Sequence, residues 1–207
     1  MAHRGQSIYN TVTKEHITFV RTTEDTNGQI LEFVCTVPTD GIPLQPHVHE
    51  TQEERFQVLR GTLGVMLDGE RFELQPGDRA VLPAGMKHQW WNAGEDEVSF
   101  RVEAEPARNL EAVLEANAGM AQAGKLTRKA MPRNPFLLAN LGKLGETYLP
   151  GIPIGLQKLG LQMGSMTGRM LGIDPGFGKY RALAAGTAPV AAPAATPAAV
   201  EVLDRAA

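Results

Sequence analysis

Two histidines one residue apart, His47 and His49, lie in the stretch HVHETQEERFQVLRG, which covers residues 47–61. The chain contains only five histidines, so this pair is the first candidate for chemistry. Side chains on a β-strand alternate between two faces, and a strand through this stretch would point both imidazoles the same way. The pair could therefore share a metal ion, or it could lie on an ordinary strand surface or in the core.

Two more residues extend this set. Glu54 lies at the start of the next predicted strand, just before Arg55, and an antiparallel neighbour would bring its carboxylate back beside the histidines. His88 lies in PGDRAVLPAGMKHQWWN, just after a Pro-x-Gly turn. Three imidazoles and one carboxylate suit a divalent first-row metal, and the set includes the two histidines and one carboxylate of many non-haem iron sites.

The elements that must position these residues are predicted to be short strands. Runs rich in Val, Phe, Leu and Ile alternate with Gly, Pro and Asp turns through residues 1–106, and Asp68-Gly69 is a hairpin signal. Many closely spaced strands predict a sandwich or barrel. The expected strands are His16–Val20, Ile30–Val37, Pro46–His49, Arg55–Leu59, Leu63–Leu67, Arg71–Leu74, Arg79–Leu82, Lys87–Asn92 and Val98–Glu103.

Helical patterns replace the strands over residues 107–183. Apolar residues at helical spacing predict a helix within 107–124, and Asn134 before Pro135 predicts the start of another. A third segment spaces four glycines by four residues, which leaves one bare helix face for close packing. Packing within the chain or across a dimer is favoured over contact with a membrane interface or a lid function. These glycines are Gly160, Gly164, Gly168 and Gly172.

The last 24 residues, 184–207, are mostly Ala, Pro, Thr and Val, which predicts a disordered tail. The expected organisation is therefore a β-domain over 1–106, a helical extension over 107–183 and this tail. The N-terminal residues lack an apolar signal segment, so a cytoplasmic location is expected. The one cysteine, Cys35, lies in an apolar run and is predicted to be a buried structural thiol.

Charge is divided unevenly between these parts. Residues 1–106 hold 9 basic and 17 acidic residues, whereas residues 107–183 hold 10 basic and 4 acidic residues. The two parts could attract each other within a chain or across a dimer. The basic part lacks interleaved aromatic residues, so no nucleic-acid partner is expected.

The chain resembles the cupin superfamily over about residues 30–105. The first cupin motif has the form Gly, His-x-His, Glu, Gly, and the second has the form Gly, Pro-x-Gly, His, Asn. Every position is filled here, by Gly41, His47, His49, Glu54 and Gly61 and then by Gly77, Pro83, Gly85, His88 and Asn92. The looser spacing of the first motif would allow Glu53 as the acid, but the six residues before Gly61 favour Glu54.

The resemblance implies a small antiparallel jelly-roll β-barrel, followed here by an α-helical C-terminal extension. It also implies that His47, His49, Glu54 and His88 bind one divalent metal ion per chain, which could be Fe, Mn, Ni, Co or Zn. Glu54 could act as an acid or base if it leaves the metal. Single-domain cupins usually form homodimers, so a homodimer is expected.

Strand alternation predicts the lining of a substrate pocket. Residues on the faces of His88 and Glu54, and one on a facing strand, would surround a small molecule; these are Trp90, Asn92, Phe56, Val58 and Met66. Such a lining favours an aromatic or enolic substrate that meets the metal through oxygen. An oxygenase similar to quercetinase-type dioxygenases is the first hypothesis. A non-redox isomerase, decarboxylase or polyketide-cyclase-like enzyme is the second, and a non-catalytic binding or sensing protein is the third.

Overall fold

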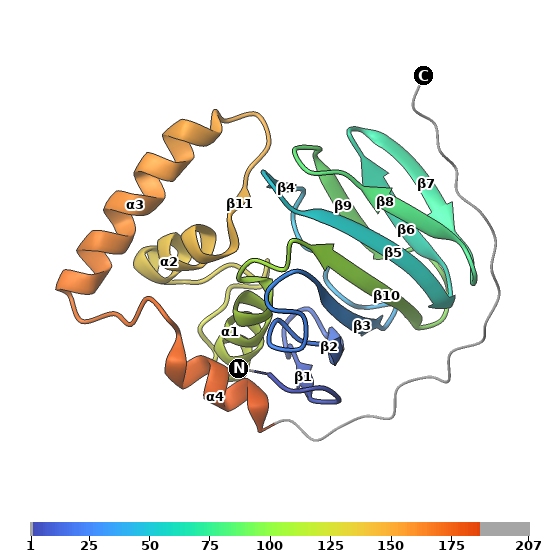
Figure 1. Cartoon of the computed structure of the whole chain (residues 1–207), viewed down its shortest axis with the longest axis horizontal. Helices are drawn as coiled ribbons and strands as arrows, with labels where there is room; N and C mark the ends of the chain where they lie inside the picture. Colours follow the sequence, from blue (N-terminus) through green and yellow to red (C-terminus); the bar gives the residue numbers. More distant parts are fainter. Residues whose placement is uncertain (1, 187–207) are drawn as a thin grey trace.

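The structure is a computed structural model that describes residues 2–186. Most of the predicted tail therefore lies outside the described residues. Strands fill one side of the molecule and helices the other, as Figure 1 shows. The β-rich core with C-terminal helices confirms the predicted fold class.

Two larger antiparallel sheets form most of the β region. The larger sheet has the strand order β1-β2-β3-β10-β5-β8 and the smaller one has the order β7-β6-β9. Their strands are β1 (Ser7–Tyr9), β2 (His16–Arg21), β3 (Leu31–Val37), β5 (Glu53–Arg60), β6 (Leu63–Leu67), β7 (Glu70–Leu74), β8 (Arg79–Leu82), β9 (His88–Asn92) and β10 (Val98–Glu105). The predicted strand at 46–49 is shorter, as β4 (Val48–His49), and β1 was not predicted.

Turn chemistry fixes how neighbouring strands meet. The Asp68-Gly69 turn joins β6 to β7, and both residues have positive φ, of 49° and 102°. The motif glycine Gly61 has φ 75°, and a Cβ there would lie 2.6 Å from the carbonyl oxygen of Glu97. A larger residue would therefore be strained and would also collide with the loop before β10.

Four helices and a short strand follow the barrel. They are α1 (Leu110–Gln122), α2 (Pro135–Gly145), β11 (Thr147–Tyr148), α3 (Ile154–Met170) and α4 (Gly178–Ala185). The predicted cap of α2 is confirmed, because the Asn134 side chain accepts hydrogen bonds from the backbone N–H groups of Phe136 and Leu137. Helix α4 extends into the first two residues of the predicted tail, and Ala184 is buried.

Glycines of α3 provide close packing within the chain. A Cβ added at Gly164 would lie 2.7 Å from the Ala139 side chain of α2, and one at Gly168 would lie 3.0 Å from Phe136. Gly160 has open space around it, and Gly172 follows the helix with φ 77°. Two of the four glycines thus form the expected bare face, and its partner is α2 rather than a second molecule.

Helix α1 connects the helices to the barrel. Its buried Glu111 accepts hydrogen bonds from the backbone N–H groups of Ala2 and Thr23 and from the Thr23 hydroxyl. One turn later, buried Glu115 pairs with Arg181 of α4 at 2.7 Å. These two carboxylates hold α1 between the barrel and α4.

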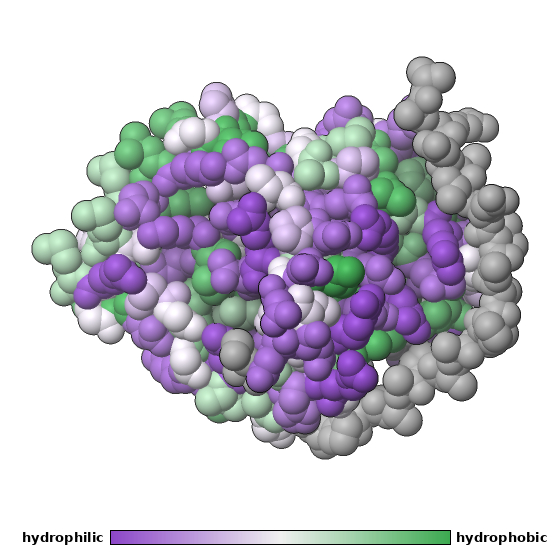
Figure 2. All heavy atoms as spheres, in the orientation of Figure 1, coloured by the Kyte–Doolittle hydropathy of each residue, from purple (hydrophilic) through white to green (hydrophobic). Residues whose placement is uncertain are grey.

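The outer face of α3 is apolar. Green spheres lie among purple ones along the left edge of Figure 2, where α3 runs, and the exposed side chains include Leu156, Leu159, Met163, Met166 and Met170. Lys158, on the same helix, pairs with Glu50 at 2.5 Å, so the acidic and basic parts do meet within one chain. No helix within residues 2–186 is long and apolar enough to cross a membrane.

Candidate metal centre

Backbone pairing places the three histidines side by side. The N–H of His47 donates to the carbonyl of His88, and the N–H of His88 donates to the carbonyl of His47. The carbonyl of His49 accepts from the N–H of Gly85, in the predicted Pro-x-Gly turn. Strand β11 of the helical region pairs with β4, with Thr147 opposite His49. Residues from two distant parts of the chain, around 85–88 and 147–148, therefore fix this strand.

The imidazole rings cluster closely. The ring centroids of His47 and His88 are 4.4 Å apart, and those of His47 and His49 are 4.9 Å apart. One ligand atom from each of the three histidines lies within 4.8 Å of the others, so the cluster could hold a metal ion.

Glu54 joins this cluster from β5. Its carboxylate oxygens lie 3.6 Å from Nε2 of His49 and 3.7 Å from Nε2 of His88. These separations are too long for hydrogen bonds. They match the spacing expected around one ion, because ligands about 2.1 Å from a metal stand about 3 Å or more apart.

Hydrogen bonds orient two of the rings. Nδ1 of His47 lies 2.9 Å from the carbonyl oxygen of Gln45, and Nδ1 of His88 lies 3.0 Å from that of Met86. A carbonyl accepts only, so each Nδ1 carries the proton and each Nε2 keeps a free lone pair. The buried Nε2 of His88 has no hydrogen-bond partner in the part of the chain that the structure describes. Metal-binding histidines show this arrangement.

Burial disfavours the charged forms of His47 and His49. It lowers the pKa of His47 to about 4, assisted by repulsion from His88, and it lowers the pKa of His49 well below its ordinary value. Burial also raises the pKa of Glu54, partly opposed by His88. Each shift reflects the cost of an uncompensated charge in this site, a cost that a bound cation would relieve for the carboxylate.

The other acidic residues of the stretch 47–61, Glu50 and Glu53, point away from the histidine cluster. Glu53 pairs with Arg55 at 2.6 Å, and Glu50 pairs with Lys158. Only Glu54 of these three lines the cavity beside the histidines.

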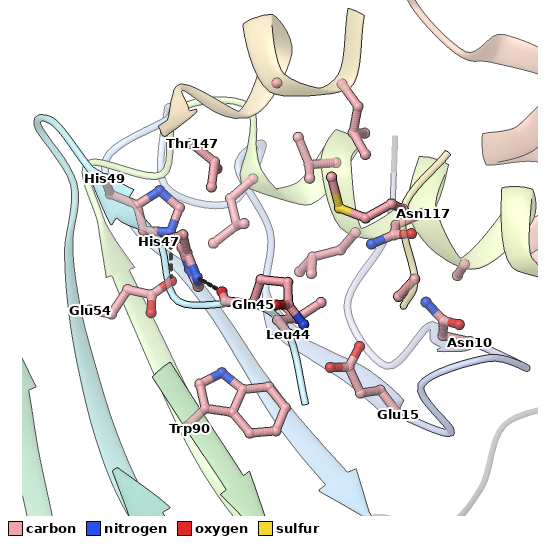
Figure 3. Close-up of a pocket in the computed structure, with 18 of the residues that line it drawn as sticks. Asn10, Glu15, Leu44, Gln45, His47, His49, Glu54, Trp90, Asn117 and Thr147 are labelled. Atoms are coloured by element: carbon pink, nitrogen blue, oxygen red, sulfur yellow. Dashed lines mark hydrogen bonds and ion pairs between the residues drawn. The ribbon is translucent and has the colours of Figure 1, made fainter. Parts of the chain in front are cut away.

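A cavity of about 310 Å³ adjoins the cluster. His47, His49 and Glu54 lie along one side of it in Figure 3, and Trp90 lies below them. Phe100 contacts both Trp90 and Phe56, with ring centroids 5.0 and 5.4 Å away, so the three aromatic side chains form a continuous wall. The cavity is therefore largely apolar, with His47, His49 and Glu54 at one end, whereas His88 does not line it.

Two of the five predicted pocket residues, Phe56 and Trp90, line this cavity, and three do not. Val58 and Asn92 are each two residues farther along their strands, beyond the aromatic wall, and Asn92 donates to the carbonyls of Val37 and Asp96. Met66 pairs with Gln89, so it faces away from His88 and Trp90. Alternation gives the face of a strand, but it gives neither the depth of a cavity nor the register of a partner strand.

The helical region supplies much of the remaining lining, and no sequence pattern predicted this contribution. Side chains from α1, α2, β11 and α3 cover the open side of the barrel; they include Leu110, Val113, Leu114, Asn117, Leu138, Leu141, Thr147 and Leu161. Glu15, in the loop before β2, also lines the cavity and was missed. Strand alternation could have predicted the position of Glu15, because Glu15 lies on the same buried face as Ile17 and Phe19.

A comparison with protein-family models matches residues 33–103 to the cupin domain. The quercetin 2,3-dioxygenase of Bacillus subtilis is 40% identical over 63 residues, which cover 30% of this chain and 19% of that protein. The oxidoreductase iacF of Pestalotiopsis fici is 29% identical over 104 residues, or 47% of this chain and 50% of that protein.

The polyketide synthase CurC of Streptomyces cyaneus is 37% identical over 57 residues, which cover 28% of this chain and 37% of that protein. The chain thus spans half or less of the length of each of these relatives. The family match contains His47, His49, Glu54 and His88, whereas Glu15 and all four helices lie outside it. The chain therefore contains a cupin domain at residues 33–103, followed by a helical region that the family model does not cover.

Proposed function

We propose that this protein is a metal-dependent oxygenase that acts on a small, largely apolar molecule carrying an enol or phenol oxygen. The observation that carries the proposal is the cluster of three imidazoles and one carboxylate, of which His47, His49 and Glu54 line one end of an apolar cavity. The partial similarity to a quercetin 2,3-dioxygenase and to an oxidoreductase supports oxygen chemistry over the alternatives.

The residues fit a divalent first-row metal. Nitrogen and carboxylate donors suit Fe, Mn, Co, Ni and Zn, and the tautomers of His47 and His88 direct Nε2 into the cluster. His47, His49, His88 and Glu54 would hold the ion. A bound ion would supply a Lewis acid and open positions where oxygen and substrate can meet.

The chain's own residues would position the substrate and exclude water. The aromatic wall of Phe56, Trp90 and Phe100 would contact its apolar body. The helices that cover the barrel would keep solvent from the reacting end. Glu54 is the nearest carboxylate, and burial raises its pKa, so it would exchange a proton with a substrate hydroxyl if it leaves the ion.

A non-redox reaction is the second candidate. The similarity to the polyketide synthase CurC favours it, because that protein's name points to polyketide chemistry. The same site would then stabilise an enolate while Glu54 moves the proton, as in an isomerase, decarboxylase or cyclase.

Oxygen consumption separates the two candidates. Protein reconstituted with Fe(II), Mn(II), Co(II) or Ni(II) would be incubated with flavonols and 1,3-diketones in an oxygen electrode. Metal-dependent uptake of one O₂ per substrate consumed supports the oxygenase. Turnover without oxygen uptake supports the non-redox enzyme, and tight binding without turnover supports a binding protein. His49→Ala is the matched control, because it removes one imidazole of the cluster.

A homodimer is part of the same proposal. The apolar outer face of α3 remains uncovered in the single chain. Light scattering coupled to gel filtration would give the mass directly, and a value near the monomer's 22.4 kDa contradicts this part of the proposal.

A further inference from the structure

Glu15 is a buried carboxyl group at the end of the cavity that lies away from the histidines. Its side chain points into the cavity in Figure 3, with Asn117 facing it from α1. Only 6% of Glu15 is exposed to solvent. An acid in this position is costly unless a partner compensates it, so the position calls for an explanation.

Neither group has its full complement of partners. Oε1 of Glu15 and Oδ1 of Asn117 are both buried, and neither has a hydrogen-bond partner within residues 2–186. Buried polar atoms without partners are rare in folded proteins and often mark the place of a ligand or a bound water. Here two such atoms line one cavity from opposite elements, the loop before β2 and helix α1.

The other polar side chain at this end is Asn10, whose Oδ1 already accepts hydrogen bonds from the backbone N–H groups of Val12 and Thr13. Asn117 continues the cavity-facing stripe of α1 that begins with Leu110, Val113 and Leu114, and it is the first polar residue in that stripe. Ile17 and Phe33 line the barrel side next to Glu15. The cavity therefore has a polar group at each end, with an apolar stretch between them.

We propose that Glu15 and Asn117 form a second polar subsite that binds a hydroxyl group at the far end of an elongated apolar ligand. The ligand's other end would meet the histidine cluster, and that part rests on the proposed function. A hydroxyl fits because it both donates and accepts: it can donate to Oδ1 of Asn117 while it hydrogen-bonds the Glu15 carboxyl group. The substrate class is thus an aromatic or polycyclic enol with a phenol or alcohol at its opposite end.

The electrostatics favour a neutral hydroxyl over a cation. Burial raises the pKa of Glu15 to about 7, opposed in part by a hydrogen bond with Thr13. The carboxyl group is therefore substantially protonated near neutral pH, and it can donate a hydrogen bond. The titratable neighbour on β3 is Cys35, and burial and Glu15 together raise the pKa of its thiol well above the ordinary value, so it adds no charge.

A matched pair of probes tests the subsite. The probes are 3-hydroxyflavone and 3,4′-dihydroxyflavone, which share the chelating hydroxy-ketone and differ by one hydroxyl on the far ring. The protein is loaded with zinc in order to prevent turnover. The intrinsic fluorescence of the two probes then reports their binding. We expect the dihydroxy probe to bind the wild type about tenfold more tightly, as one buried hydrogen-bonded hydroxyl would give.

Substitution of Glu15 then tests whether this residue causes the difference in affinity between the two probes. In Glu15→Leu the ratio of the affinities for the two probes should fall to about one, while 3-hydroxyflavone binds as it does to the wild type. Glu15→Gln should retain part of the preference for the dihydroxy probe. Glu73→Leu, the same change at an exposed position of β7, should leave the preference intact. No preference in the wild type, an unchanged preference in Glu15→Leu, or no binding of either probe would overturn the proposal.

The metal end is tested separately with His49→Ala. Loss of affinity for both probes by the same factor supports the metal site. If His49→Ala binds both as the wild type does while the preference still depends on Glu15, the subsite stands and the proposed metal function fails.

Discussion

His47 and His88 are each held by the carbonyl group two residues earlier in the chain, that of Gln45 and that of Met86. This local hydrogen bond sets the tautomer of each ring, and burial lowers the pKa of His47 to about 4. A ring whose Nε2 is free is ready to bind a cation without first losing a proton. The buried carboxylate of Glu54 supplies the negative charge that a divalent ion needs.

The first prediction concerns this donor set. His49→Ala should lose tight metal binding, because it removes one of four donors and leaves a cavity beside Glu54. Elemental analysis of purified protein is expected to fall from about one divalent ion per chain to well below half. His3→Ala, at an exposed position, should keep the wild-type content. Equal metal content in the two variants is incompatible with the proposed ligands.

The second prediction concerns Glu15 and pH. Its pKa is about 7 in the folded protein against 4.5 ordinarily, so the folded state binds this proton more tightly than the unfolded state. The wild type should therefore lose stability relative to Glu15→Gln as the pH rises from about 4.5 to 7, and little more above that. The total loss is at most about 3 kcal/mol.

Urea unfolding of both proteins across this range gives the free-energy difference directly. Cys35 is the titratable neighbour, and its raised pKa keeps it protonated throughout the range. A difference between wild type and Glu15→Gln that stays constant with pH would show that Glu15 titrates normally.

At the scale of elements, α3 is attached to α2 by its glycine face. Gly164 is the closest point, since any Cβ there would lie 2.7 Å from the Cβ of Ala139. Gly142 of α2 makes the reciprocal approach, with a Cβ there 3.1 Å from Leu161. The spacing of four residues thus serves helix packing within the chain.

The third prediction compares two glycines of this helix. Gly164→Ala should destabilise the protein by about 1–2 kcal/mol, because α3 must move away from α2. Gly160→Ala has open space and should stabilise it by about 0.5–1 kcal/mol through higher helix propensity. Chemical denaturation of both variants measures the contrast. Equal effects of the two substitutions would mean that α3 does not pack on α2 through Gly164.

Local signals predicted most strands and the cap of α2 because their causes are local. Alternation, the Asp68-Gly69 turn and the Asn134 cap each depend on neighbouring residues. Strands β1 and β11 have only three and two residues, too few for a periodic pattern. The orientation of Met66 depends on which residue of β9 it pairs with, and the cover over the cavity depends on where α1 packs. Both are contacts between distant segments, which no local pattern encodes.

At the scale of the whole molecule, the barrel and the helices share one cavity and one set of buried contacts. The chain changes from strands to helices between Glu105 and Leu110, but α1 packs back against the barrel, and Glu111 binds the N-terminal segment and the β2–β3 loop. Strand β11 pairs with the histidine strand itself. The helices therefore belong to the architecture of the site.

The fourth prediction is that both regions unfold together. Trp90 and Trp91 lie in the barrel, so their fluorescence reports on the barrel, while far-UV circular dichroism is dominated by the helices. The two denaturation curves should coincide. Glu111→Ala should lower the free energy of unfolding from both curves by about 3 kcal/mol, since it leaves the buried N–H of Ala2 and the half-buried N–H of Thr23 without an acceptor. Glu24→Ala, at an exposed position of the same loop, should shift neither. If Glu111→Ala separated the helical transition from the fluorescence transition, the helices would be an independent unit, and a truncated barrel would then be expected to keep its metal without them.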